Sequence, residues 1–115
     1  MRPKDRVVRH CSPDALKLLG DYTTLRIVDF LSESALRFTD LRRALVDTNA
    51  PTLIDRLRRM TEAGFLKRTE ATLDKKSVLY ELSEEGKALI PVLREIQKFA
   101  VRHFPETEPR DDHRA

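Results

Sequence analysis

Apolar residues recur at helical spacing within residues 49–64, whose sequence reads NAPTLIDRLRRMTEAG. Leu53, Leu57 and Met60 stand at positions i, i+4 and i+7, and this spacing predicts one amphipathic helix with a single apolar stripe. Asn49 is expected to cap this helix, and Gly64 to supply its left-handed stop. Ile54 and Ala63 lie beside the three apolar residues and belong to the same stripe. The opposite side holds Thr52, Asp55, Arg59 and Glu62, with Arg56 and Arg58 at its flanks.

The segments on either side of this helix predict a winged helix-turn-helix. Residues 38–45 show a second short helical pattern, and only residues 46–48 separate the two helices. After Gly64 the apolar period changes from 3.6 to 2 in residues 65–69 and again in residues 77–82, which predicts a hairpin with a polar tip. In a winged helix the second helix lies in the major groove of DNA, and the wing contacts the flanking backbone.

The patterns before this unit predict two helices and a strand. Ser12, followed by Pro13, is expected to cap a short helix that ends at Gly20. A second helix is predicted over residues 24–31, where Leu25, Ile27, Val28 and Leu31 are dense enough to be core, with Asp21 or Thr23 at its start. Residues 36–38 are expected to form a third strand.

After the wing, one long helix is predicted from Ser83 to Phe104. Pro91 is tolerated if it lies near the first turns and otherwise bends the helix. The apolar stripe of this helix either covers the chain's own core or forms a two-fold interface with the first helix of a second chain. We favour a homodimer, with an interface of Leu16, Leu93, Ile96, Phe99, Ala100 and Phe104.

The predicted fold class is mainly α with a small antiparallel β-wing, a winged helix-turn-helix with N- and C-terminal dimerisation helices. Residues 1–11 are expected to be a flexible basic arm, residues 12–104 the winged helix domain, and residues 105–115 a disordered tail. A length of 115 residues fits one such domain. With 36% charged residues and no long apolar run, we expect a cytoplasmic protein without a membrane span.

Positive charge is concentrated in the predicted helix-turn-helix and wing. Residues 37–76 hold ten Lys or Arg against six Asp or Glu, whereas the rest of the chain holds twelve against thirteen. Such a surplus is typical of a surface that replaces the counterions of nucleic acid phosphates, although basic residues also commonly solvate helix faces. The residues that we expect to contact double-stranded DNA are Arg37, Arg42, Arg43, Asn49, Thr52, Arg56, Arg59, Lys75 and Lys76.

Within this set, two arginines are the best candidates for contacts inside the groove or at its edge. Arg56 and Arg59 each carry a guanidinium fork that pairs bidentately with guanine or with a phosphate. Asp55 either accepts a hydrogen bond from cytosine or pairs locally with Arg58 or Arg59. Arg42, Arg43, Lys75 and Lys76 are better interpreted as phosphate contacts, which position the protein without specifying a sequence. Arg37 could take either role.

Seven short motifs in this order resemble those of the HxlR-type winged-helix transcriptional regulators, which are MarR-like. They are Cys11-Ser12-Pro13, Leu19-Gly20-Asp21-Tyr22, Arg37-Phe38-Thr39-Asp40-Leu41, Leu53-Ile54-Asp55-Arg56-Leu57, Gly64-Phe65-Leu66-Lys67-Arg68, Val78-Leu79-Tyr80-Glu81-Leu82 and Gly86. The chain departs from the family where Ser12 is inserted, where Tyr22 replaces a usual Trp, and in the turn before the recognition helix. The resemblance implies a regulator that binds DNA, and it does not carry over the target sequence.

Cys11 is the only cysteine, and the family includes thiol sensors. Arg9, His10 and the following helix N-terminus favour the thiolate, so Cys11 is a candidate redox sensor that would form an intersubunit disulfide or a mixed disulfide with a small thiol. The alternative is a small, half-buried residue without that role.

Catalytic and metal-binding signals are weak. His10, His103 and His113 lie far apart in the sequence, and we find no Gly-rich phosphate loop or nucleophile elbow. We therefore expect no enzyme, no metal and no cofactor.

The sequence predicts a homodimeric, sequence-specific DNA-binding transcriptional regulator whose small-molecule or oxidant effector changes the angle between subunits. The alternative is a winged helix that binds an acidic protein partner and not DNA.

Overall fold

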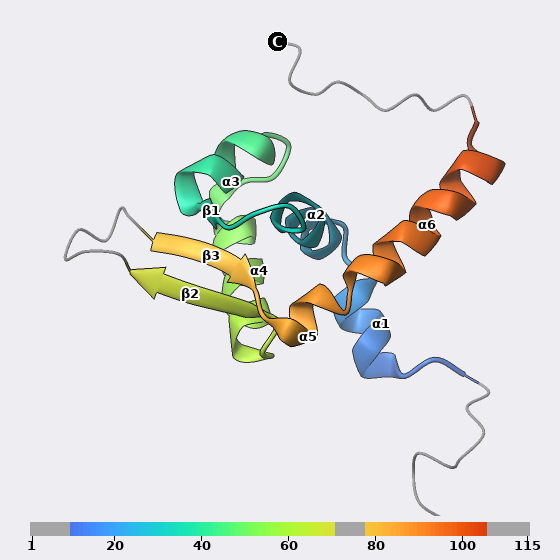
Figure 1. Cartoon of the computed structure of the whole chain (residues 1–115), viewed down its shortest axis with the longest axis horizontal. Helices are drawn as coiled ribbons and strands as arrows, with labels where there is room; N and C mark the ends of the chain where they lie inside the picture. The colour runs from blue at the N-terminus through green and yellow to red at the C-terminus, as the bar shows by residue number, and fades with distance from the viewer. Residues whose placement is uncertain (1–9, 71–77, 106–115) are drawn as a thin grey trace, which may run out of the picture.

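The computed structural model describes residues 10–70 and 78–105, with helices and strands in the order of a winged helix (Figure 1). The helices are α1 (Pro13–Leu19), α2 (Tyr22–Leu31), α3 (Phe38–Ala44), α4 (Ala50–Glu62), α5 (Glu84–Lys87) and α6 (Ile90–His103). The strands are β1 (Leu36–Arg37), β2 (Leu66–Glu70) and β3 (Val78–Leu82). The predicted mainly α winged helix with a small antiparallel sheet is confirmed. Most of the predicted arm, the wing tip and most of the predicted tail lie outside the described residues.

Four polar side chains cap helices. Ser12, Asn49 and Ser83 are the caps that the sequence predicts, and Asp21 is one of its two candidates for α2, which begins two residues earlier than predicted. The Ser12 hydroxyl accepts a hydrogen bond from the N–H of the third residue along, as do the side chains of Asp21, Asn49 and Ser83, at distances of 2.8–3.3 Å. Each such cap satisfies an N–H that has no partner inside its helix and is typically worth about 1 kcal/mol. Gly64, with a φ of 90°, provides the left-handed residue after α4.

The sheet is antiparallel, with β3 in its centre and the strand order β1-β3-β2. Leu66 pairs with Leu82 on one side of β3, and Leu36 pairs with Tyr80 on the other. Val78, Tyr80 and Leu82 are buried at alternate positions, as the period of 2 predicted. The third strand predicted for residues 36–38 is confirmed as β1, although Phe38 already belongs to α3.

The core lies between this sheet and the helices α2, α3 and α4 (Figure 1). Leu53, Leu57 and Met60 of α4 are at most 1% exposed, so the predicted stripe is confirmed. Ile54, assigned to the same stripe from the sequence, is instead 53% exposed. It lies about 100° around the helix from Leu53, and among residues 10–70 and 78–105 no element buries that side of α4.

The predicted long C-terminal helix is wrong in one respect, because it consists of two helices. The short helix α5 ends at Lys87, and α6 begins at Ile90 with Pro91 in its first turn. Pro91 lacks an N–H and is therefore suited to a helix start and unsuited to a helix interior. Between the two helices, Leu89 is 7% exposed and packs into the core.

The helix α5 is fixed to the start of the wing. The Ser83 hydroxyl donates a hydrogen bond to the Gly64 carbonyl at 2.6 Å, and the Ser83 N–H donates to the Phe65 carbonyl at 3.1 Å. A Cβ atom on Gly86 would lie 2.1 Å from the Phe65 oxygen, so only glycine fits there. These contacts set the direction in which α6 leaves the domain. Its C-terminal half extends away from the sheet, and α6 has no buried residue (Figure 1).

Candidate DNA-binding surface

The recognition helix α4 is held to the domain by its apolar side, and its other sides face outward. Buried Leu41 and Leu45 fix α3 against the same core, so the turn between α3 and α4 has a defined position. Along the outward side of α4, the residues classed as exposed are Pro51, Ile54, Arg58, Arg59 and Glu62.

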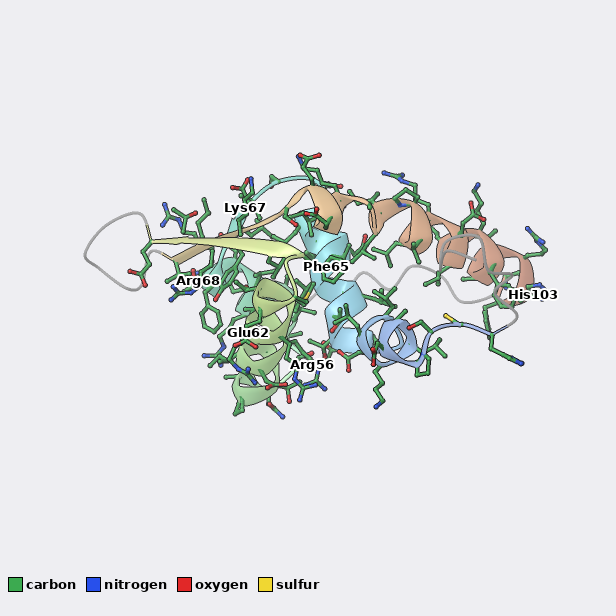
Figure 2. The ribbon with its side chains drawn as sticks, turned by 90° about the horizontal axis from the view of Figure 1, so that it is seen from below. Arg56, Glu62, Phe65, Lys67, Arg68 and His103 are labelled. Atoms are coloured by element: carbon green, nitrogen blue, oxygen red, sulfur yellow. The ribbon has the colours of Figure 1, made fainter. Side chains whose placement is uncertain are left out.

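Arg56 joins α4 to the start of α2. Its Nε lies 2.9 Å from Oδ2 of Asp21, and its Nη1 lies 2.7 Å from Oδ2 of Asp55. Its side chain is 25% exposed, and Figure 2 shows it on the side of α4 that faces α1 and α2. Partial burial acts to raise the pKa of Asp21, but hydrogen bonds from Arg56 and Thr24 leave that pKa below its ordinary value. In this geometry Arg56 positions the helix.

Asp55 forms ion pairs with the other two arginines of α4. Its carboxylate lies 2.8 Å from Nη2 of Arg58 and 2.9 Å from Nε of Arg59, so the predicted local pairing is confirmed. Arg58 also lies 3.2 Å from Glu62. Desolvation acts to raise the pKa of Asp55, yet the hydrogen bonds from Arg58 and Arg56 lower it overall. Within the described residues, these three arginines are therefore balanced by three carboxylates.

A second contact from α2 reaches the turn of the helix-turn-helix. The Tyr22 hydroxyl donates a hydrogen bond to Oδ2 of Asp47 at 2.5 Å, and Arg26 donates to the same hydroxyl. The bond from Tyr22 lowers the pKa of Asp47 and raises that of Tyr22. This cluster was not predicted from the sequence. The one feature that pointed to it was Tyr22 itself, whose hydroxyl can form hydrogen bonds, at a position where the family usually has tryptophan. Residues at the start of α2 therefore contact two neighbouring segments. Tyr22 binds the loop between α3 and α4, and Asp21 binds α4 itself.

The other predicted contact residues are dispersed around this helix. Arg37 is exposed at the start of α3, and Arg42 and Arg43 are exposed in its last turn. The side chain of Arg43 is 80% exposed and lies 3.5 Å from Asp40. Exposed pairs of this kind contribute little, so a phosphate readily replaces the carboxylate. Lys75 and Lys76 lie outside the described residues.

At the N-terminus of α4, Asn49 acts first as a cap. Its Oδ1 accepts the Thr52 N–H at 2.8 Å, and Thr52 itself is half-buried. Pro51 has no N–H to offer, so this helix start has little remaining capacity for a phosphate.

Two basic residues on the wing were not singled out as contacts from the sequence. Lys67 and Arg68 are both exposed on β2, and Figure 2 shows Arg68 on the side of the strand where α4 lies and Lys67 on the opposite side. Arg68 lies 3.1 Å from Glu70. Their position in the motif that opens the wing was the signal that could have identified them.

The predicted interface residues Leu93, Ile96, Phe99 and Ala100 recur at helical spacing and form an apolar strip along α6; Phe104 follows that helix, and Leu16 lies on α1. Leu16 is 56% exposed, Ile96 46%, Phe99 54% and Phe104 58%, while Leu93 and Ala100 are half-buried. Exposed apolar patches, unlike single exposed apolar residues, commonly mark surfaces that bind another protein.

Cys11 lies just before α1 as an exposed free thiol. Among the described residues there is no group of three His, Cys, Asp or Glu residues placed to hold a metal ion. In the same part of the chain, no helix has the length and apolar character needed to cross a membrane.

Comparison with known proteins identifies the family of the chain. The family model for the HxlR-like helix-turn-helix matches residues 18–108. The uncharacterized HTH-type transcriptional regulator YvaP of Bacillus subtilis (strain 168) is 31% identical over 86 residues, which cover 75% of this chain and 80% of that protein.

Solved structures agree with this assignment. The transcriptional regulator YodB from B. subtilis, in its reduced form, has a TM-score of 0.67 at 26% identity and covers 89% of this chain and 100% of its own. A protein assigned to the MarR family, from Porphyromonas gingivalis W83, has the same fold, with a TM-score of 0.73 at 23% identity and coverage of 84% and 96%. With its outward recognition helix, its wing and these relatives, the chain belongs to the HxlR-like helix-turn-helix family of DNA-binding transcriptional regulators.

Proposed function

We propose that this regulator acts in the cytoplasm as a homodimer built on α6 and α1. The observation that carries the dimer is the strip of Leu16, Ile96, Phe99 and Phe104, each close to half exposed or more. A second copy related by a two-fold axis would cover this strip with the same strip of its own. Two-fold symmetry would also match the palindromic sites that helix-turn-helix dimers bind.

In the proposed complex each α4 enters one of two successive major grooves, and each wing lies along the flanking backbone. Arg42, Arg43 and Arg37 of the α3 region contact phosphates, together with Lys75 and Lys76, and Asn49, Thr52 and Arg59 lie near the groove. Arg56 has a different role in this proposal. Its bonds to Asp21 and Asp55 support a part in holding α4 at the correct angle, with at most an edge contact to DNA.

The experiment is a salt titration of duplex binding, combined with sedimentation of the free protein and of the complex. Binding should weaken log-linearly with salt, with a slope of about −0.9 for each phosphate contact. Two chains should be present per duplex. A flat salt dependence would favour the protein-interaction alternative, and one chain per duplex would overturn the dimer.

We further propose that oxidation of Cys11 regulates DNA binding. The thiol is exposed, and YodB, which is similar to this chain at 26% identity, has also been solved in a quinone-bound form, with a TM-score of 0.67 and coverage of 77% of this chain and 93% of its own. A peroxide would take two electrons from two Cys11 thiolates, one from each subunit, forming an intersubunit disulfide while it is reduced to water or alcohol. A mixed disulfide with a small thiol is the alternative product.

The new disulfide would change the angle between the subunits and hence the fit to the half-sites. The test compares peroxide-dependent release of a bound duplex for the wild type and for Cys11→Ser. Release that is unchanged in Cys11→Ser would overturn this role.

A further inference from the structure

Ile54 is the one large apolar side chain on the outward side of α4. Leu53, Leu57 and Met60 fill the core without it, and Ile54 remains 53% exposed. Its position is the fifth of the 13 residues in α4, in the N-terminal half of the helix. In helix-turn-helix proteins this half of the recognition helix meets the base edges. Leaving a β-branched apolar side chain in water there has no benefit for the folding of the isolated chain.

The charged neighbours of Ile54 are already engaged. Asp55 binds Arg58 and Arg59 at 2.8 and 2.9 Å, and Arg56 is turned toward Asp21. Pro51 and Arg58, three residues before Ile54 and four after it, lie on the same exposed side of the helix. In the first two turns of α4 the outward side therefore presents a neutral, apolar area at Pro51 and Ile54. The first cation on that side is Arg58, in the third turn.

Base edges in the major groove offer one apolar group, the C5-methyl of thymine, and apolar side chains recognise it by direct contact. Hydrogen-bonding side chains read the other bases, and Ile54 cannot do so.

We propose that Ile54 is a specificity-determining residue that packs on a thymine methyl group in each half-site. The inference rests on the proposed seating of α4 in the major groove. It predicts an A·T pair in a fixed orientation at one position of the half-site. Replacing the thymine of that pair by uracil should weaken the binding of the duplex. Uracil keeps every hydrogen-bonding group of thymine and lacks only the methyl.

The test begins with duplexes selected from a random pool by the wild-type protein. In the consensus duplex, each thymine of one half-site is replaced in turn by deoxyuridine, and dissociation constants are measured for the wild type, Ile54→Ala and Val46→Ala. Val46 is the matched control, because it is an apolar residue of the same helix-turn-helix, 71% exposed, and lies in the turn.

For the wild type, one thymine position should lose about fourfold in affinity, which corresponds to one methyl-sized group removed from water. Ile54→Ala, which removes the contact from both half-sites, should bind the thymine duplex about 16-fold more weakly. It should show no further loss with deoxyuridine, and Val46→Ala should behave as the wild type. Thermal unfolding of the variants at equal concentration controls for the fold.

The outcomes separate the inference from the proposal on which it rests. If the wild type enriches no duplex, the proposed function itself fails, and the role of Ile54 fails with it. If a duplex is enriched but no thymine is sensitive to methyl removal, or if Ile54→Ala keeps the sensitivity, the DNA-binding role stands and Ile54 does not read thymine.

Discussion

The helices α4 and α6 give similar signals in the sequence and have different surroundings in the structure. Both are amphipathic and of similar length, 13 and 14 residues. The stripe of α4 is completely covered within the chain, with Leu53, Leu57 and Met60 at most 1% exposed. On α6, by contrast, Ile96 is 46% and Phe99 54% exposed.

The difference teaches that helical periodicity identifies an apolar face but not the partner that covers it. On α4, the sheet and α2 supply the cover. On α6, the break at Ala88 and Leu89 precedes a helix that extends away from the sheet, so most of its apolar side chains stay exposed. Four substitutions, at Phe99, Leu57, Asp21 and Arg42, test this contrast.

Phe99→Glu should disrupt the dimer most strongly. A two-fold interface would contain two such carboxylates, each costing about 2 kcal/mol or more when buried without a partner. Together these correspond to roughly a thousandfold weaker self-association, to be measured by sedimentation equilibrium. Val101→Glu is the matched control, since Val101 is 68% exposed and lies on a different side of the same helix. Equal effects of the two variants would contradict the proposed interface.

Leu57→Ala should destabilise the fold itself. Its side chain is 1% exposed, and truncating such a leucine costs about 3 kcal/mol through lost burial and the cavity that remains. Denaturant unfolding at one protein concentration provides the measurement. Ile54→Ala on the same helix should cost less than about 1 kcal/mol. A loss as large as that of Leu57→Ala would mean that Ile54 is covered in solution.

Asp21→Asn should loosen α4 from α2 while it keeps the helix cap. The amide oxygen still accepts the Thr24 N–H, but the charged hydrogen bond from Arg56 is lost. This loss should lower the free energy of unfolding by about 1 kcal/mol at neutral pH. Because the pKa of Asp21 is lowered in the fold, this stabilisation is present above the ordinary aspartate pKa of about 3.9. It disappears as the pH falls through the lower folded value.

Unfolding of wild type and Asp21→Asn should therefore differ at pH 7 and converge well below pH 4. Asp29→Asn, at an exposed position of the same helix, should show little effect at either pH. A difference between Asp21→Asn and the wild type that persists unchanged in acid would rule out the charged bond as its cause.

Arg42→Ala should have the smallest effect and should act only on DNA binding. The slope of the logarithm of the binding constant against the logarithm of the salt concentration should become less steep by about 0.9 for each phosphate contact that is lost. The loss of affinity should be similar for all duplex sequences. Fluorescence anisotropy over a range of salt measures the slope. Arg94→Ala, which removes an exposed arginine from α6, should leave it unchanged.

The features that the sequence predicted correctly depend on neighbouring residues. Asn49 and Ser83 cap helices because their bonds span three residues, and the wing follows from a local change of period. The pairs Arg56–Asp21 and Tyr22–Asp47 join residues 35 and 25 positions apart, which no local pattern reveals. For the same reason the sequence did not show that Arg56 is bound to Asp21 or that Ile54 is exposed.

The half-site spacing of duplexes selected from a random pool tests the central claim most directly. If α4 is the reading element and α6 the dimer element, the wild type should select an inverted repeat. Its half-site centres should lie about 10 base pairs, one helical turn, or a multiple of this apart. Phe99→Glu should select the same half-site without a fixed spacing. Enrichment of one unrepeated site by the wild type, or no enrichment, would contradict the account.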